Sequence, residues 1–116
     1  EDRCDVRMVE LSEELRFAGG MLYVPGNLRV GERRRIEILA RDISLSLEAP
    51  HRTSILNVLP ARVEAVYDAE SAQPVVKVDV GGTSLLARVS RRSLRLLELH
   101  EGVRVFVQVK AVAVIP

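Results

Sequence analysis

The chain has 116 residues, 47% of them hydrophobic, which is enough for one ordinary domain or two very small, interlocked ones. Its formal net charge is +1, with acidic and basic residues interspersed, and this argues against the basic patch that nucleic-acid binding requires. Aromatic residues make up 3% and Trp is absent, so the core must be built from Val, Leu, Ile and Ala, and Val and Ile favour strands.

Cys4 is the single cysteine, so an internal disulfide and an oxidising compartment are not required, and we interpret it as an ordinary thiol. The sequence contains no signal peptide and no apolar run long enough to span a bilayer. Because it starts at Glu1 without methionine, we interpret it as a piece of a longer cytoplasmic chain.

The first half of the sequence alternates apolar with other residues in short segments, which is typical of strands. Gly19-Gly20 lies between two such segments and predicts a tight hairpin, and residues 25–27 (Pro-Gly-Asn) predict a turn. Two or three short strands are predicted between residues 6 and 24, where residues 15–17 and 21–23 alternate, and further strands at residues 34–40 and 43–47.

The second half repeats the alternation and adds one helix. Gly81-Gly82 predicts another hairpin, and Pro60, inside a long strand, implies a strand edge, a bulge or a strand start because proline cannot donate to a ladder. Residues 90–99 predict a short helix with Ser90 as its N-cap, closed by residues 100–102. The strands predicted here lie at residues 55–67, 75–80, 84–89, 103–109 and 112–115.

Many short strands, glycine turns and one helix predict an all-β fold of small barrels of the OB type. We expect a partial OB-like lobe over residues 1–50 and a complete barrel over residues 51–116, with residues 49–52 as the connector. The two halves resemble each other only roughly, so no repeat is predicted.

Several kinds of catalytic chemistry are missing from the sequence. There is no Gly-rich loop with the Lys-Ser/Thr ending that cradles phosphates, so ATP hydrolysis does not reside in this chain. His51 and His100 lack zinc-ligand spacing and a nucleophile partner, and we interpret both as surface residues, like the carboxylate pair Glu13-Glu14.

Three stretches, in their order and spacing, resemble the regulatory TOBE/Mop domain at the C-terminus of molybdate ABC transporter ATP-binding subunits. The resemblance covers residues 41–116 well and the first 40 residues weakly. The stretches are Arg-Asp-Ile-Ser-Leu at 41–45, Thr-Ser-Ile-Leu-Asn-Val-Leu-Pro-Ala-Arg-Val at 53–63, and Gly-Gly-Thr-Ser-Leu-Leu-Ala-Arg-Val-Ser at 81–90 with Gln-Val-Lys-Ala-Val at 108–112.

In that family a molybdate or tungstate ion lies between subunits, held by hydroxyls, backbone N–H groups and a lysine. Some members carry an arginine two residues after the serine of the domain's opening strand. This sequence has Leu56 at that position, which removes one positive charge. Arg88, Arg91 and Arg92 lie close in sequence to Ser90 and Ser93. The oxyanion-binding residues that the resemblance implies are Ser54, Ile55, Ser90, Ser93, Lys110 and Ala111.

The chemistry of these residues suits such a ligand, because a desolvated tetrahedral dianion needs several donors. Ser90 and Ser93 occupy the N-cap and N3 positions of the predicted helix, so both hydroxyls can face one ligand, and Lys110 supplies a point charge. Each also has a structural interpretation: Ser90 as a helix cap, Ser93 as surface, Ser54 as a turn residue and Lys110 as an outward strand residue.

We therefore expect a non-enzymatic regulatory domain without a cofactor, which forms a homodimer and senses cytoplasmic molybdate or tungstate. The resemblance implies an ABC ATPase domain in the same parent chain, an indirect effect on the transporter's membrane subunit, and a location in the cytoplasm at the inner membrane. Alternatives are a ligand-free dimerisation domain, a related barrel from a sugar or polyamine transporter, and an oligonucleotide-binding OB module. The scarcity of aromatic residues and lysine argues against the last of these.

Overall fold

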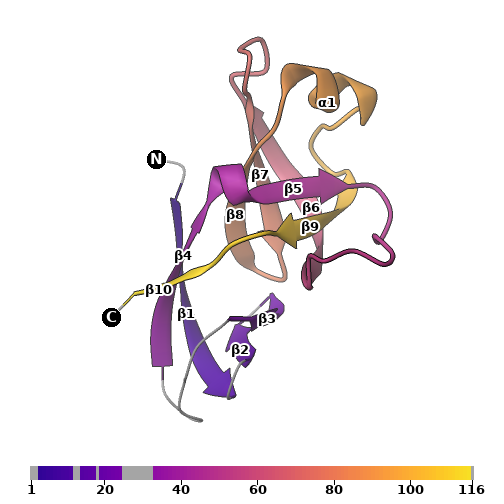
Figure 1. Cartoon of the computed structure of the whole chain (residues 1–116). Coiled ribbons are helices and arrows are strands. Elements are labelled where there is room, and N and C mark those ends of the chain that lie inside the picture. Colours follow the sequence, from indigo (N-terminus) through magenta and orange to yellow (C-terminus); the bar gives the residue numbers. More distant parts are fainter. Residues whose placement is uncertain (1–2, 12–13, 18, 25–32, 116) are drawn as a thin grey trace.

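The structure is a computed structural model that describes residues 3–11, 14–17, 19–24 and 33–115 (Figure 1). The turn predicted at residues 25–27 and Glu13 of the carboxylate pair lie outside the described residues. The elements in chain order are β1 (Arg3–Leu11), β2 (Glu14–Phe17), β3 (Gly20–Tyr23), β4 (Arg33–Leu39), the 3-10 turn η1 (Ala40–Asp42), β5 (Ile43–Ser46), β6 (Asn57–Tyr67), β7 (Val75–Val80), β8 (Thr83–Arg88), α1 (Arg91–Leu96), β9 (Arg104–Val109) and β10 (Ala113–Ile115).

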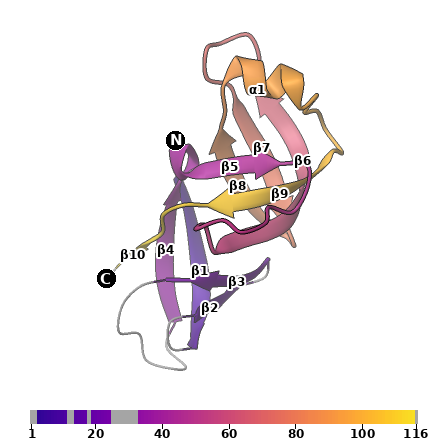
Figure 2. The same cartoon turned by 45° about the vertical axis from the view of Figure 1, so that its right-hand side comes forward.

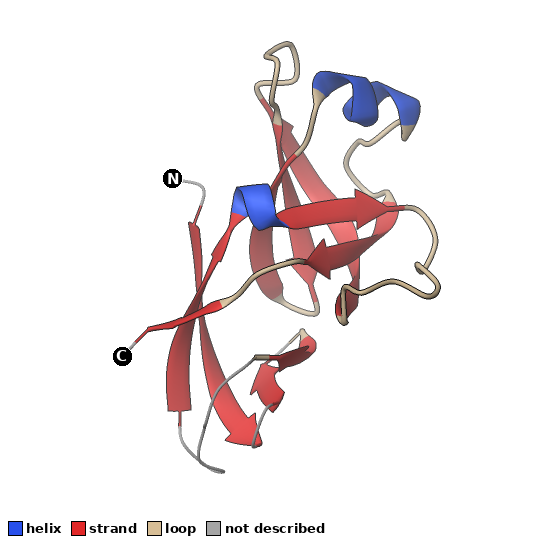
Figure 3. Cartoon of the chain, viewed as in Figure 1, coloured by secondary structure: helices blue, strands red, loops and turns tan. Residues whose placement is uncertain are grey.

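Strands dominate the described residues, and α1 is a short helix in the second half, which confirms the predicted all-β class (Figure 3). The strands form two antiparallel sheets, with the orders β10-β4-β1-β2-β3 and β5-β9-β6-β7-β8. The second sheet curls until β5 contacts β8, so that its two edge strands approach each other as in a barrel.

The two sheets exchange strands across the middle of the chain. β5 precedes residue 50 but pairs with β9 in the second sheet, whereas β10, at the other end of the chain, pairs with β4 in the first. The division into lobes over residues 1–50 and 51–116 stays a prediction, and strand pairing crosses it in both directions.

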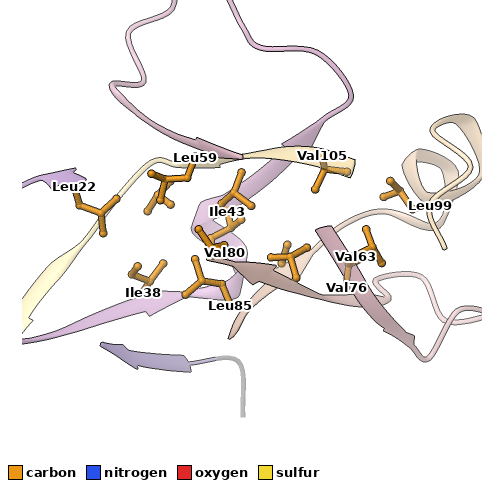
Figure 4. Packing of buried hydrophobic residues seen from close by; sticks show 14 of the residues in the cluster. Leu22, Ile38, Ile43, Leu59, Val63, Val76, Val80, Leu85, Leu99 and Val105 are labelled. Carbon is orange, nitrogen blue, oxygen red and sulfur yellow. The ribbon is translucent and has the colours of Figure 1, made fainter. Parts of the chain in front are cut away.

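One hydrophobic core joins the two sheets. Figure 4 shows Leu22 and Ile38 of the first sheet beside Leu59, Val80 and Leu85 of the second, all of them buried. Burying one such side chain stabilises the fold by about 1.5–3 kcal/mol, so the shared core makes each sheet depend on the other.

The strict alternation of valines in β9 decides which face of that strand is buried. Val105, Val107 and Val109 are each at most 2% exposed, whereas Arg104 points to solvent. Because successive side chains of a strand point to opposite faces, the period-two pattern of the sequence carries over directly to the structure.

Both predicted glycine hairpins are confirmed, and they use glycine for different reasons. Gly81 and Gly82 have φ angles of 57° and 98°, the left-handed conformation that a two-residue hairpin turn requires. Gly19 is needed for close approach instead: a Cβ there would collide with the carbonyl oxygen of Val80. The β2–β3 hairpin therefore packs against the end of β7.

Pro60 lies inside β6 at a local edge, as its missing N–H predicted. At this position β6 pairs with β9 only, through Phe106, and the pairing with β7 starts at Arg62. A bulge follows where the register with β7 shifts between Val63 and Ala65.

The helix begins where it was predicted but ends earlier. Ser90 caps α1, since its side chain accepts a hydrogen bond from the backbone N–H of Ser93, but the last helical residue is Leu96. Glu98 adopts a φ of 50°, and the N–H of Leu99 donates to the carbonyl of Leu94 at 3.1 Å, which closes a Schellman motif. The prediction that residues 100–102 close the helix is therefore wrong, because Glu98 takes the left-handed position usually given to glycine.

Candidate functional site

Four of the predicted oxyanion-binding residues gather at one end of the second sheet. β6 begins at Asn57 and β9 ends at Val109, and these two residues face each other in the ladder. The residues that flank this pair form what we call the basal cluster: Ser54, Ile55, Lys110 and Ala111.

The basal cluster combines a fixed backbone with free side chains. The backbone N–H of Lys110 donates to the carbonyl of Asp42 at 2.8 Å, while its side chain is exposed. The N–H of Ile55 donates to Oγ1 of Thr53 at 3.1 Å, so Thr53 makes the turn bond that was considered for Ser54. The side chains of Ser54 and Lys110 make no hydrogen bond or ion pair with another described residue. Both are therefore available to a ligand.

The other two predicted residues form a hydrogen-bonded pair at the start of α1. Oγ of Ser90 accepts from the N–H of Ser93 at 3.0 Å and donates to Oγ of Ser93 at 2.9 Å. Ser90 is thus a helix cap, and Ser93, half-buried, keeps its own hydroxyl proton for a further acceptor.

An open groove of about 570 Å³ lies beside this pair. Arg91 Nη1 donates to the backbone carbonyl of Glu70 at 2.9 Å, and Arg95 Nη2 lies 3.9 Å from the Glu70 carboxylate. The Arg95–Glu70 pair is largely exposed and contributes little stability. The groove is lined by Ala72, Ser90, Arg91, Arg92, Arg95 and Leu96.

The basal cluster and the serine pair lie at opposite ends of the barrel. Tyr67 at the end of β6 pairs with Val75, and Val75 pairs with Arg88, which places Ser90 near the end of β6 that is remote from Ser54. β6 has 11 residues, about 36 Å of strand at roughly 3.3 Å per residue. In Figures 1 and 2, α1 lies at the top, away from the end of β9. One chain therefore does not bring the six predicted residues together.

Asn57 is a residue whose importance the sequence analysis missed. It is 9% exposed, its Oδ1 accepts from the N–H of Tyr23 at 2.7 Å, and its Nδ2 donates to the carbonyl of Tyr23 at 3.0 Å. The amide thus acts as a strand partner that ties β3 of the first sheet to the start of β6. One feature of the sequence could have indicated this role: Asn57 is a single amide within the apolar run Ile-Leu-Asn-Val-Leu, and a polar side chain buried there needs hydrogen-bond partners.

His51 and His100 are both exposed, as the sequence analysis predicted. Among the described residues there is no group of three or more His, Cys, Asp or Glu side chains that could hold a metal ion. The same residues include no helix of the length and apolar character that crossing a membrane requires.

These features define a small β-barrel domain with polar clusters at both ends. The chain belongs to the TOBE domain family, whose model matches residues 53–116. Its curated relatives are molybdenum import ATP-binding proteins named ModC. The chain is 46% identical over 102 residues to the one from Aromatoleum aromaticum, 48% over 107 residues to one from Rhodopseudomonas palustris, and 49% over 104 residues to the one from Thiobacillus denitrificans.

The aligned segments cover 87–88% of this chain but 27–29% of each relative, so the chain spans little more than a quarter of their length. The resemblance to the TOBE domain of molybdate transporter ATP-binding subunits is confirmed. The prediction that this chain is a non-enzymatic domain is confirmed as well, because it corresponds to the TOBE portion of these longer ATP-binding proteins.

A solved structure supports the fold over almost the whole chain. The cytoplasmic molybdate-binding protein ModG, crystallised with molybdate bound, superposes with a TM-score of 0.81 at 20% identity, covering 99% of this chain and 94% of that one. This likeness confirms the predicted fold of small OB-like barrels.

Proposed function

We propose that this chain is the regulatory oxyanion-binding domain of a molybdate or tungstate importer's ATP-binding subunit. Two copies pair, and the anion lies between them. The basal cluster of one copy (Ser54, Ile55, Lys110 and Ala111) meets Ser90 and Ser93 of the other.

The observation that carries the proposal is the separation of the two clusters. Each has hydroxyl donors available at the surface, yet they lie at opposite ends of one barrel. In a dimer with a two-fold axis, the basal cluster of each copy can face the serine pair of the other, which forms two equivalent sites. The names of the ModC relatives and of the ModG neighbour support molybdate as the ligand.

Two exposed leucines support the pairing of these particular surfaces. Leu56, beside the basal cluster, is 70% exposed, and Leu96, in the groove beside the serine pair, is 73% exposed. Removing their apolar surface from water in a dimer is favourable by about 25 cal/mol per Å². Covering both leucines when the clusters meet excludes water from the anion, which strengthens its hydrogen bonds.

The mechanism requires donors that replace the hydration shell of a tetrahedral dianion. Lys110 supplies a charge, Ser54 and Ser93 supply hydroxyl protons, and a backbone N–H such as that of Ala111 completes the shell. Micromolar affinity needs about 8 kcal/mol, which a handful of charge-assisted and neutral donors supplies. The anion changes the activity of an attached ATPase only to the extent that it binds one arrangement of the pair more tightly.

In this proposal the parent chain also carries an ABC ATPase domain, and the paired domain acts through it on the transporter's membrane subunit. The location is then the cytoplasm, at the inner membrane. The ATP-binding names of the relatives support this arrangement, since the chain covers little more than a quarter of their length.

The test is calorimetric titration of the chain with molybdate, with tungstate and sulfate in parallel, and sedimentation of each sample. We expect micromolar binding of molybdate or tungstate, no sulfate binding, and at least a tenfold loss in Lys110→Ala. Lys77→Ala is the matched control, because Lys77 is the other lysine and lies on β7, away from both clusters.

A folded pair that binds neither molybdate nor tungstate would contradict the proposal and favour the ligand-free dimerisation domain. Binding of single-stranded oligonucleotides with steep salt dependence would instead favour the OB module.

A further inference from the structure

The groove beside α1 concentrates positive charge in a chain whose formal net charge is only +1. Arg91, Arg92 and Arg95 are among its lining residues, and the Glu70 carboxylate lies 3.9 Å from Nη2 of Arg95. Guanidinium groups present several N–H donors in a fixed plane that matches two oxygens of an oxyanion. The groove therefore has the chemistry of an anion-binding surface.

The three arginines differ in the hydrogen bonds and ion pairs that they already make. Glu70 holds two of them, through its backbone carbonyl at 2.9 Å from Arg91 Nη1 and its carboxylate at 3.9 Å from Arg95 Nη2. Arg92 is exposed and makes no hydrogen bond or ion pair with any other described residue. Its full set of donors is available to a ligand.

The proposed site needs more positive charge than the basal cluster supplies. A dianion carries two negative charges, and the basal cluster offers one cation, Lys110. Leu56, the exposed residue next to that cluster, is apolar and adds none. Burying an anion with part of its charge uncompensated is costly, so a second cation beside the anion stabilises the site.

We propose that the arginine groove supplies this second charge and that Arg92 is a direct ligand of the oxyanion, next to Ser90 and Ser93. Arg91 and Arg95 stay on Glu70, and Arg91, which contacts only a backbone carbonyl there, adds to the local positive potential. The inference rests on the proposed function, because the Lys110 half of the site comes from the partner copy.

The experiment is titration of the chain and of Arg92→Gln with sodium molybdate, with sedimentation and circular dichroism of each variant. We expect Arg92→Gln to remain folded and paired and to bind molybdate at least about tenfold more weakly, the usual effect of losing a hydrogen bond from a charged group. Arg92→Lys restores the charge without the planar fork and recovers only part of the affinity. Arg62→Gln is the matched control, since Arg62 is exposed on β6 and does not line the groove.

Three other outcomes overturn the inference, and they are distinguishable. If the unmodified chain binds molybdate and Arg92→Gln binds it within twofold, Arg92 is no ligand although the proposed function stands. If Arg92→Gln loses binding because the pair dissociates, Arg92 is an interface residue instead. If the unmodified chain binds no oxyanion, the proposed function fails and this inference fails with it.

Discussion

Replacing Asn57 by leucine tests whether one buried amide joins the two sheets. The side chain keeps its branched shape, at a larger volume, but loses both hydrogen bonds to Tyr23, of 2.7 Å and 3.0 Å. The backbone N–H and carbonyl of Tyr23 are then left without these partners. Each bond contributes about 0.5–1.5 kcal/mol, and an unsatisfied buried group costs about 1–3 kcal/mol.

Tyr23 is 47% exposed and its two hydrogen bonds with Asn57 are only partly buried, so the full penalty does not apply. We therefore expect Asn57→Leu to lower the free energy of unfolding by about 2–3 kcal/mol. For a chain of this length that corresponds to a fall in Tm of about 8–12 °C. Thermal and urea unfolding followed by circular dichroism measure the change.

Gln108→Leu is the matched control, because Gln108 is half-buried on β9, one register position from the partner of Asn57, and its side-chain amide makes no hydrogen bond with another described residue. We expect a change within about 0.5 kcal/mol there. Hydrogen exchange adds a local readout, since the amide of Tyr23 should lose protection in Asn57→Leu. A destabilisation below about 0.5 kcal/mol with the Tyr23 amide still protected would refute the coupling role.

Three further substitutions test other local features, each measured as the free energy of urea unfolding without anion. Glu98→Gly should stabilise the chain by about 0.5–1 kcal/mol, since Glu98 holds a φ of 50° that glycine adopts without strain; a destabilisation would contradict this. Ser90→Ala should cost about 1 kcal/mol through loss of the helix cap, and an unchanged stability would mean that the bond to Ser93 is dispensable. Gly19→Ala should destabilise by about 1–3 kcal/mol, because its Cβ meets the Val80 carbonyl; wild-type stability would show that the hairpin shifts freely.

The sequence alone was sufficient for features governed by neighbouring residues. The alternation in residues 103–109 predicted β9, because a strand exposes one face and buries the other irrespective of its partners. Gly81-Gly82 predicted a hairpin and Ser90 a cap for the same reason: backbone conformation and a bond to a residue three positions away are local. The end of the helix was missed because glutamate seldom takes the left-handed position that Glu98 adopts.

The resemblance to TOBE domains named six candidate residues, but the sequence could not show their arrangement. Strand alternation tells which face is buried, not which strand lies next to it. The placement of Ser54 and Lys110 at one end of the barrel and of Ser90 at the other therefore became visible only through the pairing of β6, β7 and β8.

What the sequence determined by itself is most of the strands, the hairpins and the helix N-cap, together with the family, because these depend on residue type and short spacing. It did not place β1, the nine-residue strand in the middle of the first sheet. The tertiary structure alone decided that β5 and β10 exchange sheets, that Asn57 binds Tyr23, and that Arg92 lines a groove together with Ala72. Each of these features brings together residues that are far apart in the chain. Such contacts depend on hydrophobic burial over the whole molecule, which dominates the free energy of folding, and not on local backbone propensity.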